Sequence, residues 1–186
     1  DDKLLTETSN HRKLINKPIS MGLPQISFRG KLDGNTVWGY TSNYLNSDRY
    51  LHMADLFVKG EKSKREIFKS TFSLKDCVKM SFELAEALKF FNEASFVHAD
   101  INPQNIFFDK IQKSIILIDY ESGGIDPETP STEGKQGRWL PPEFQQPGGV
   151  FDFEDFAAAD CWSLGLIIHY LLLREHPLYF LAKLGK

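Results

Sequence analysis

The sequence has few cysteines and almost no net charge, and each shortage excludes a class of protein. Its 186 residues include only two cysteines, Cys77 and Cys161. Two cysteines this far apart indicate neither a disulfide framework nor a cysteine metal site, so we expect reduced, buried thiols and a cytoplasmic location. The 22 basic and 25 acidic residues give a net charge of −3, which offers no general attraction to nucleic acid.

The sequence also lacks a signal peptide and a long apolar run. The most apolar segment, residues 164–173, contains His169 and Tyr170 and is shorter than the roughly 20 residues that a membrane-spanning helix needs. We therefore expect no membrane and no nucleic-acid partner. What the sequence does contain is 41% hydrophobic residues and 15 phenylalanines, enough for a globular core rich in aromatic side chains.

Apolar periodicity and turn signals predict a mixture of helices and short strands. Residues 25–40 predict a β-hairpin around an Asp-Gly-Asn turn, and residues 106–118 predict a second, buried hairpin. Residues 74–92 predict a long helix after Ser73, and residues 160–173 a buried one. The remaining segments are predicted to be a helix over 1–17, a short helix over 49–58, a charged turn over 60–65, a long functional or disordered loop over 119–142 and a surface loop over 150–156.

Three oxygen-bearing side chains lie at the ends of the second hairpin. Asp100 and Asn105 precede its first strand, and Asp119 directly follows its second. Taken singly, Asp100 and Asn105 could be turn residues around Pro103. Together, Asn105 and Asp119 could hold Mg²⁺, which prefers oxygen ligands, and Asp100 could orient a hydroxyl and accept its proton during phosphoryl transfer.

Four motifs in this order resemble the protein kinase superfamily. Residues 98–105 (HADINPQN) resemble the catalytic loop H-R-D-x-x-x-x-N, and residues 119–121 (DYE) lie where D-F-G is expected. Residues 141–143 (PPE) resemble A-P-E, and residues 160–165 (DCWSLG) resemble the start of the buried central helix of the large lobe. The resemblance implies an α+β, bilobal protein-kinase-like fold. Residues 1–45 would be the remainder of the small lobe and the hinge, and residues 46–186 a large lobe truncated at its C-terminus.

The resemblance also implies an enzyme and assigns roles to single residues. The expected activity is an ATP- and Mg²⁺-dependent transfer of the γ-phosphoryl group to a protein hydroxyl, on serine or threonine in preference to tyrosine. Asp100 would be the catalytic base or hydroxyl positioner, and Asn105 and Asp119 would hold Mg²⁺ against the ATP phosphates. Phe107 would lie under the adenine ring, although its pattern fits the core equally well. Asp160 would anchor the backbone of the catalytic loop.

Further side chains are expected to have structural roles. His98 and Tyr120 would pack together in the stack that links the two lobes. Trp162, Ile167 and Leu171 are expected in the core of the large lobe.

Departures from the kinase pattern support two alternatives. No G-x-G-x-x-G loop and no V-A-I-K strand occurs, while Ala99, Asn102 and Glu121 replace the usual Arg, the Lys of serine/threonine kinases and the Gly of D-F-G. These changes favour a pseudokinase or regulatory binding module. Residues 118–121 (IDYE) also resemble the metal segment of aminoglycoside and choline kinases, which would make the protein a small-molecule kinase. The PPE and DCWSLG motifs, which resemble those of protein kinases, argue against this second alternative.

Overall fold

The computed structural model describes residues 26–32, 35–41, 44–58, 62–120, 122–125, 138–145 and 149–175. The predicted helix over 1–17 and Glu121 lie outside these ranges. The helices are α2 (Lys62–Thr71), α3 (Leu74–Glu93) and α4 (Phe153–Leu173), with short 3-10 segments η1 (Met53–Phe57), η2 (Pro103–Asn105) and η3 (Pro142–Gln145). The strands are β1 (Ile26–Leu32), β2 (Asn35–Thr41), β3 (Tyr50–His52), β4 (Phe96–Val97), β5 (Ile106–Asp109), β6 (Ser114–Leu117) and β7 (Gly124–Ile125).

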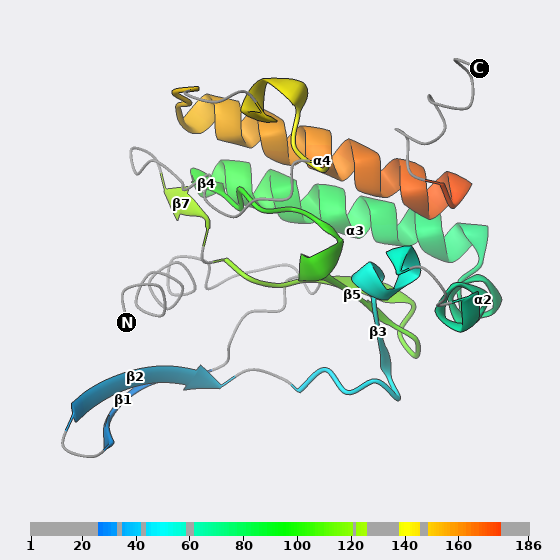
Figure 1. Ribbon diagram of the computed structural model, residues 1–186, viewed down its shortest axis with the longest axis horizontal. Helices are drawn as coiled ribbons and strands as arrows, with labels where there is room; N and C mark the ends of the chain where they lie inside the picture. Colours follow the sequence, from blue (N-terminus) through cyan, green and yellow to red (C-terminus); the bar gives the residue numbers. More distant parts are fainter. Residues whose placement is uncertain are drawn as a thin grey trace.

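Two long helices pack against each other. Figure 1 shows α3 and α4 side by side, with the chain running in opposite directions along them. Helix α3 begins where the sequence predicts, because Ser73 and Asp76 form a reciprocal capping box in which each side chain accepts from the other's backbone N–H, at 3.2 and 2.8 Å.

Helix α4 begins seven residues earlier than predicted. Asp152 caps it through a second capping box with Asp155, so the predicted surface loop over 150–156 is wrong and its second half is the first turn of the helix. The resulting 21 residues have a mean hydropathy of 1.6 over their most apolar window, long and apolar enough to cross a membrane by length and composition. The length argument against a membrane span therefore fails, although one face of α4 packs in the core against α3.

The two predicted hairpins are confirmed. Strands β1 and β2 pair in antiparallel register from Ile26 opposite Thr41 to Leu32 opposite Asn35. Strand β5 is the centre of a three-stranded antiparallel sheet, with β3 on one side and β6 on the other.

Two of the shorter predictions are wrong. The predicted helix over 49–58 is strand β3 followed by η1, because Leu51 is buried where it pairs with β5. The predicted turn over 60–65 is instead largely the start of α2, whose single buried residue Phe68 attaches an otherwise charged helix to the core. Charged residues with one apolar anchor per two turns give too weak a periodicity to predict such a helix.

The core is aromatic, as the composition predicts, but two residues expected inside lie at the surface. Phe68, Phe72 and Phe108 form one cluster with ring centroids 4.8 to 5.6 Å apart. Cys161 and Trp162 are exposed, Trp162 by 43%. Asp160 and Ser163, three positions apart, face the protein interior, so the two residues between them point to the other side of α4. Ile167 and Leu171 are buried as predicted, and so is Cys77.

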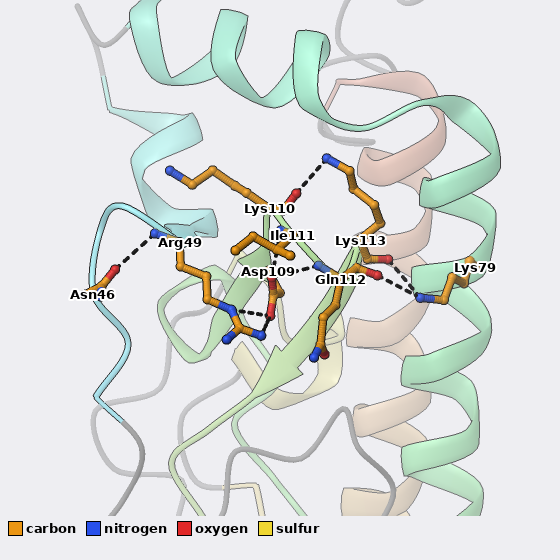
Figure 2. Close-up of polar contacts among 8 residues, drawn as sticks. All are labelled: Asn46, Arg49, Lys79, Asp109, Lys110, Ile111, Gln112 and Lys113. Atoms are coloured by element: carbon orange, nitrogen blue, oxygen red, sulfur yellow. Dashed lines mark hydrogen bonds and ion pairs between the residues drawn. The ribbon is translucent and has the colours of Figure 1, made fainter.

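The buried carboxylate of Asp109, at the end of the central strand β5, stabilises one end of the three-stranded sheet (Figure 2). The Arg49 Nε and Nη2 atoms both donate to Asp109 Oδ2, at 2.9 and 2.6 Å. The backbone N–H groups of Ile111 and Gln112 donate to Asp109 Oδ1, at 2.8 and 2.9 Å. Burial raises the pKa of Asp109, but these hydrogen bonds and the Arg49 charge lower that pKa by more, so it lies below its ordinary value. The chain before β3 is thereby held against the β5–β6 turn.

We predict that Asp109→Asn lowers the free energy of unfolding by about 2 kcal/mol at pH 7, because a charge-assisted hydrogen-bond network is lost. The folded-state pKa of Asp109 is depressed, so its contribution is present above the unfolded pKa of about 3.9 and disappears as the pH falls. Urea unfolding of both proteins at pH 7 and pH 3 measures this, and the difference should shrink at pH 3. Asp55→Asn, which removes only the half-exposed pair with Lys64, is the control. An equal loss in both variants would contradict the prediction.

Candidate active site

The carboxylate of Asp100 is held between two amide side chains. Asn102 Nδ2 donates to Asp100 Oδ1 at 2.8 Å, and Asn105 Nδ2 donates to Asp100 Oδ2 at 2.8 Å. The same two nitrogens also donate to the backbone carbonyl of Asp100, at 3.2 and 2.9 Å. The 3-10 segment η2 makes this possible, because Asn102 caps it by accepting from Gln104 N–H at 2.8 Å and so fixes the spacing of the two amides. Asp100 is therefore oriented, and each of its oxygens keeps capacity for a further hydrogen.

The loop that carries Asp100 is anchored from helix α4. Asp160 accepts from the backbone N–H of His98 at 2.7 Å and of Ala99 at 2.9 Å, which confirms the anchoring role expected for it. Asp160 is 4% exposed, and these amides help to satisfy its charge. Ala99 has a φ of 61°, a left-handed conformation that a residue with a Cβ adopts only at a cost, so the two hydrogen bonds hold a strained turn directly before Asp100.

The β5–β6 hairpin brings Asn105 and Asp119 to neighbouring positions. Ile106 pairs with Leu117, and the backbone N–H of Ile118 donates to the Asn105 carbonyl at 2.9 Å, so the backbone of Asn105 lies beside the residue that precedes Asp119. Asp119 is exposed and has a φ of 65°, a second left-handed residue at this site. The structure thus places all three predicted residues around one end of a single hairpin.

The donor set suits Mg²⁺. Asn105 uses its Nδ2 on Asp100, which leaves its Oδ1 as the atom that can face a cation, and the exposed carboxylate of Asp119 supplies anionic oxygen. Within the described ranges no group of three or more His, Cys, Asp and Glu side chains could form a closed metal site. Two protein oxygen ligands, one of them on the exposed Asp119, are the arrangement expected when phosphate oxygens and water complete the coordination of Mg²⁺.

His98 and Tyr120 pack together beneath this site, as predicted. Their ring centroids are 4.9 Å apart, both side chains are fully buried, and the Tyr120 hydroxyl donates to the Leu117 carbonyl at 3.0 Å. His98 Nδ1 accepts from the backbone N–H of Asp100 at 3.3 Å, so the ring proton lies on Nε2 and is directed at the Ile118 carbonyl, 3.1 Å away. One neutral imidazole therefore links the backbone of Asp100 to the strand end that carries Asp119.

Phe107 has a partner that the sequence does not indicate. Its ring stacks on His52 with centroids 4.4 Å apart and an angle of 10° between the planes. His52 lies opposite Phe107 in the β3–β5 pairing, and His52 Nε2 is 2.7 Å from the Gln104 carbonyl. Phe107 is half-buried, so its place under an adenine ring stays a prediction.

Gly123 allows the chain after Asp119 to pass close to strand β4. A Cβ at this position would lie 2.6 Å from the Val97 carbonyl oxygen. We predict that Gly123→Ala lowers the free energy of unfolding by about 2 kcal/mol, because the β4–β7 pairing must move apart. Thermal or urea denaturation measures the change. Gly165→Ala is the control, since a Cβ there meets nothing within 4 Å and the helix should gain stability. Equal stability of the Gly123 variant and the unmodified protein would contradict this account.

Comparison with known proteins agrees with this fold. A family model described as "Protein kinase domain" matches residues 24–183. The chain is 23% identical over 158 residues to vascular endothelial growth factor receptor 1 of Mus musculus, covering 85% of the chain and 11% of that protein. It is 26% identical over 164 residues to calcium/calmodulin-dependent protein kinase type 1 of Caenorhabditis briggsae, covering 83% of the chain and 43% of that protein. The enzyme of the same name from Macrobrachium nipponense is 27% identical over 145 residues, with coverages of 73% and 39%.

The fold and the site define a kinase-type domain, with Asp100 and Asn105 in the loop before β5 and Asp119 after β6. The chain belongs to the protein kinase family. The predicted family and the predicted α+β kinase fold are therefore confirmed. The chain spans less than half the length of these relatives.

Proposed function

We propose that this protein is an active protein kinase that transfers the γ-phosphoryl group of ATP, with Mg²⁺, to a hydroxyl group of a protein substrate. The observation that carries the proposal is the Asp100 carboxylate fixed by Asn102 and Asn105 at 2.8 Å each, beside a hairpin that carries Asp119. A carboxylate oriented in this way can accept a proton from a substrate hydroxyl, which is the chemistry that phosphoryl transfer needs from the protein. A cytoplasmic location is part of the same proposal.

The residues of the site have separate roles at the same end of the β5–β6 hairpin. Asn105 Oδ1 and the Asp119 carboxylate would hold Mg²⁺, which when bound neutralises charge on the transferred phosphoryl group. Asp100 would position the acceptor hydroxyl and take its proton on a carboxylate oxygen. Asp160 and His98 hold the loop backbone in place while this happens.

We also propose serine or threonine as the acceptor. The support is the similarity to calcium/calmodulin-dependent protein kinases. Asn102 is a departure, because it occupies the position where the kinase pattern of serine/threonine enzymes has Lys. Its Nδ2 donates to Asp100 Oδ1, so a hydrogen-bond donor is kept at this place although the positive charge is lost.

The test uses the full-length protein, radiolabelled ATP and a degenerate peptide mixture containing Ser, Thr and Tyr acceptors. We expect Mg²⁺-dependent labelling of Ser and Thr that is lost in Asp119→Ala. Labelling of Tyr alone would overturn the acceptor class. Absence of transfer together with unchanged thermal stability on adding ATP and Mg²⁺ would overturn the enzyme proposal in favour of a pseudokinase, which Ala99 and Asn102 would then explain. Transfer to a small alcohol but to no peptide would favour the small-molecule kinase.

A further inference from the structure

A cavity lies between helix α2 and the C-terminal end of α4, apart from the residues of the active site. Its volume is about 390 Å³. In Figure 1, α2 lies beneath the end of α4 and next to the start of α3. The lining residues are Lys62, Arg65, Glu66, Phe68, Lys69, Tyr170 and Arg174.

The lining carries an excess of positive charge. Four of the seven lining residues are Lys or Arg, and one is acidic. Glu66 pairs with Lys69 at 3.3 Å. Lys62, Arg65 and Arg174 form no ion pair within the described part of the chain. The first turn of α2 has no acidic residue, so Lys62 and Arg65 lie at the positive end of the helix dipole, where cations are unfavourable.

Arg174 lies in the wall of the cavity, where several contacts fix its guanidinium group. Its guanidinium lies over the Phe68 ring at 4.2 Å, and its Nη2 donates to the Phe72 carbonyl at 3.2 Å and to Cys77 Sγ at 3.1 Å. Its Nη1 is buried and makes no hydrogen bond in the part of the chain that the structure describes. Arg174 also ends α4 with a φ of 61°, a position where glycine costs least.

The cations of this lining are unfavourable close to one another and at the start of α2, and a bound anion would compensate for their charge. Its charge would offset Lys62 and Arg65 at the start of α2 and the part-buried guanidinium of Arg174. Lys62, Arg65 and Lys69 follow one another at i, i+3 and i+7, so they share one face of α2 over about two turns. A row of separated cations matches several carboxylates along an extended segment better than it matches one compact anion.

We infer that this cavity binds an acidic segment of a protein partner or substrate, with Asp or Glu carboxylates facing Lys62, Arg65 and Arg174. The inference goes beyond the proposed phosphotransfer, since it needs neither ATP nor the Asp100 loop.

Binding of a fluorescently labelled Glu-rich peptide to the full-length protein, without ATP, tests this inference by fluorescence anisotropy. We expect the double variant Lys62→Gln/Arg65→Gln to bind the peptide about tenfold more weakly, with a shallower salt dependence. Both residues are exposed, so the variant should fold. Lys75→Gln/Lys89→Gln removes two exposed lysines of α3 outside the cavity and should bind as the unmodified protein does.

Three outcomes would overturn the inference. The first is equal binding by both double variants, and the second is no preference for the Glu-rich peptide over its Gln counterpart. The third is displacement of the peptide by single-stranded DNA or inorganic phosphate at lower concentration than by unlabelled peptide, which would identify a phosphate site. Because no phosphoryl transfer is measured, failure here leaves the proposed kinase activity intact.

Discussion

Asp100→Asn should lower the rate of phosphotransfer by a factor of about 100 to 10,000, because the side chain can no longer accept the proton of the acceptor hydroxyl. The substitution keeps the shape of the side chain. It replaces one oxygen acceptor by an NH₂ group that faces an amide donor, either Asn102 or Asn105. We expect the affinity for ATP to stay within about threefold and the melting temperature to fall by no more than about 3 °C. Initial rates at saturating ATP and peptide, with a thermal unfolding scan, measure both.

A matched control separates the loss of a base from the loss of a charge. Asp48→Asn removes one exposed carboxylate from the loop before β3 and should leave the rate unchanged. If Asp100→Asn retained more than about half of the wild-type rate, Asp100 would have no role in proton transfer and the proposed mechanism would be wrong.

Asp160→Asn should be the most destabilising single substitution that we predict, at about 3 kcal/mol in the free energy of unfolding. The carboxylate is buried and accepts from the backbone N–H of His98 and Ala99. In the variant an NH₂ group would face one of these N–H groups, which leaves a buried donor unsatisfied. We also expect phosphotransfer to fall with stability, since the strained backbone at Ala99 loses its support.

Urea unfolding and initial rates of the same preparation test this prediction. Glu154→Gln is the control, because it changes an exposed carboxylate in the first turn of the same helix. A stable Asp160→Asn protein with full activity would show that the two N–H groups find other acceptors, and the anchoring role would then be rejected.

The residues of the candidate site could be predicted from the sequence, while their mutual support could not. The sequence predicts that Asp100, Asn105 and Asp119 lie together, because two short apolar strands with a polar turn predict a hairpin, and a hairpin brings its ends together. In the sequence Asn102 is a simple departure from the kinase pattern, and only the structure shows that it donates to Asp100. His52 gave no signal at all, because its contact with Phe107 depends on the register of β3 against β5.

Among the helices, the start of α3 could be predicted from the sequence, whereas the start of α4 and the whole of α2 could not. The start of α3 followed from a Ser-x-x-Asp pattern before a strongly periodic segment. Helix α4 carries the same kind of signal at Asp152, but the aromatic and acidic residues that follow conceal its periodicity. Helix α2 has too few apolar residues to be recognised, although its charged face lines the cavity described above.

The attachment of two distant loops to helix α4 has a consequence for hydrogen exchange. Ser163, one turn after Asp160, donates to the Trp139 carbonyl at 2.7 Å, so one helix holds both the backbone before Asp100 and the segment that contains Trp139. The amide protons of His98 and Ala99 can therefore reach solvent only when Asp160 withdraws. In a deuterium-exchange experiment these loop amides should exchange as slowly as the middle of α4, at the rate of global opening.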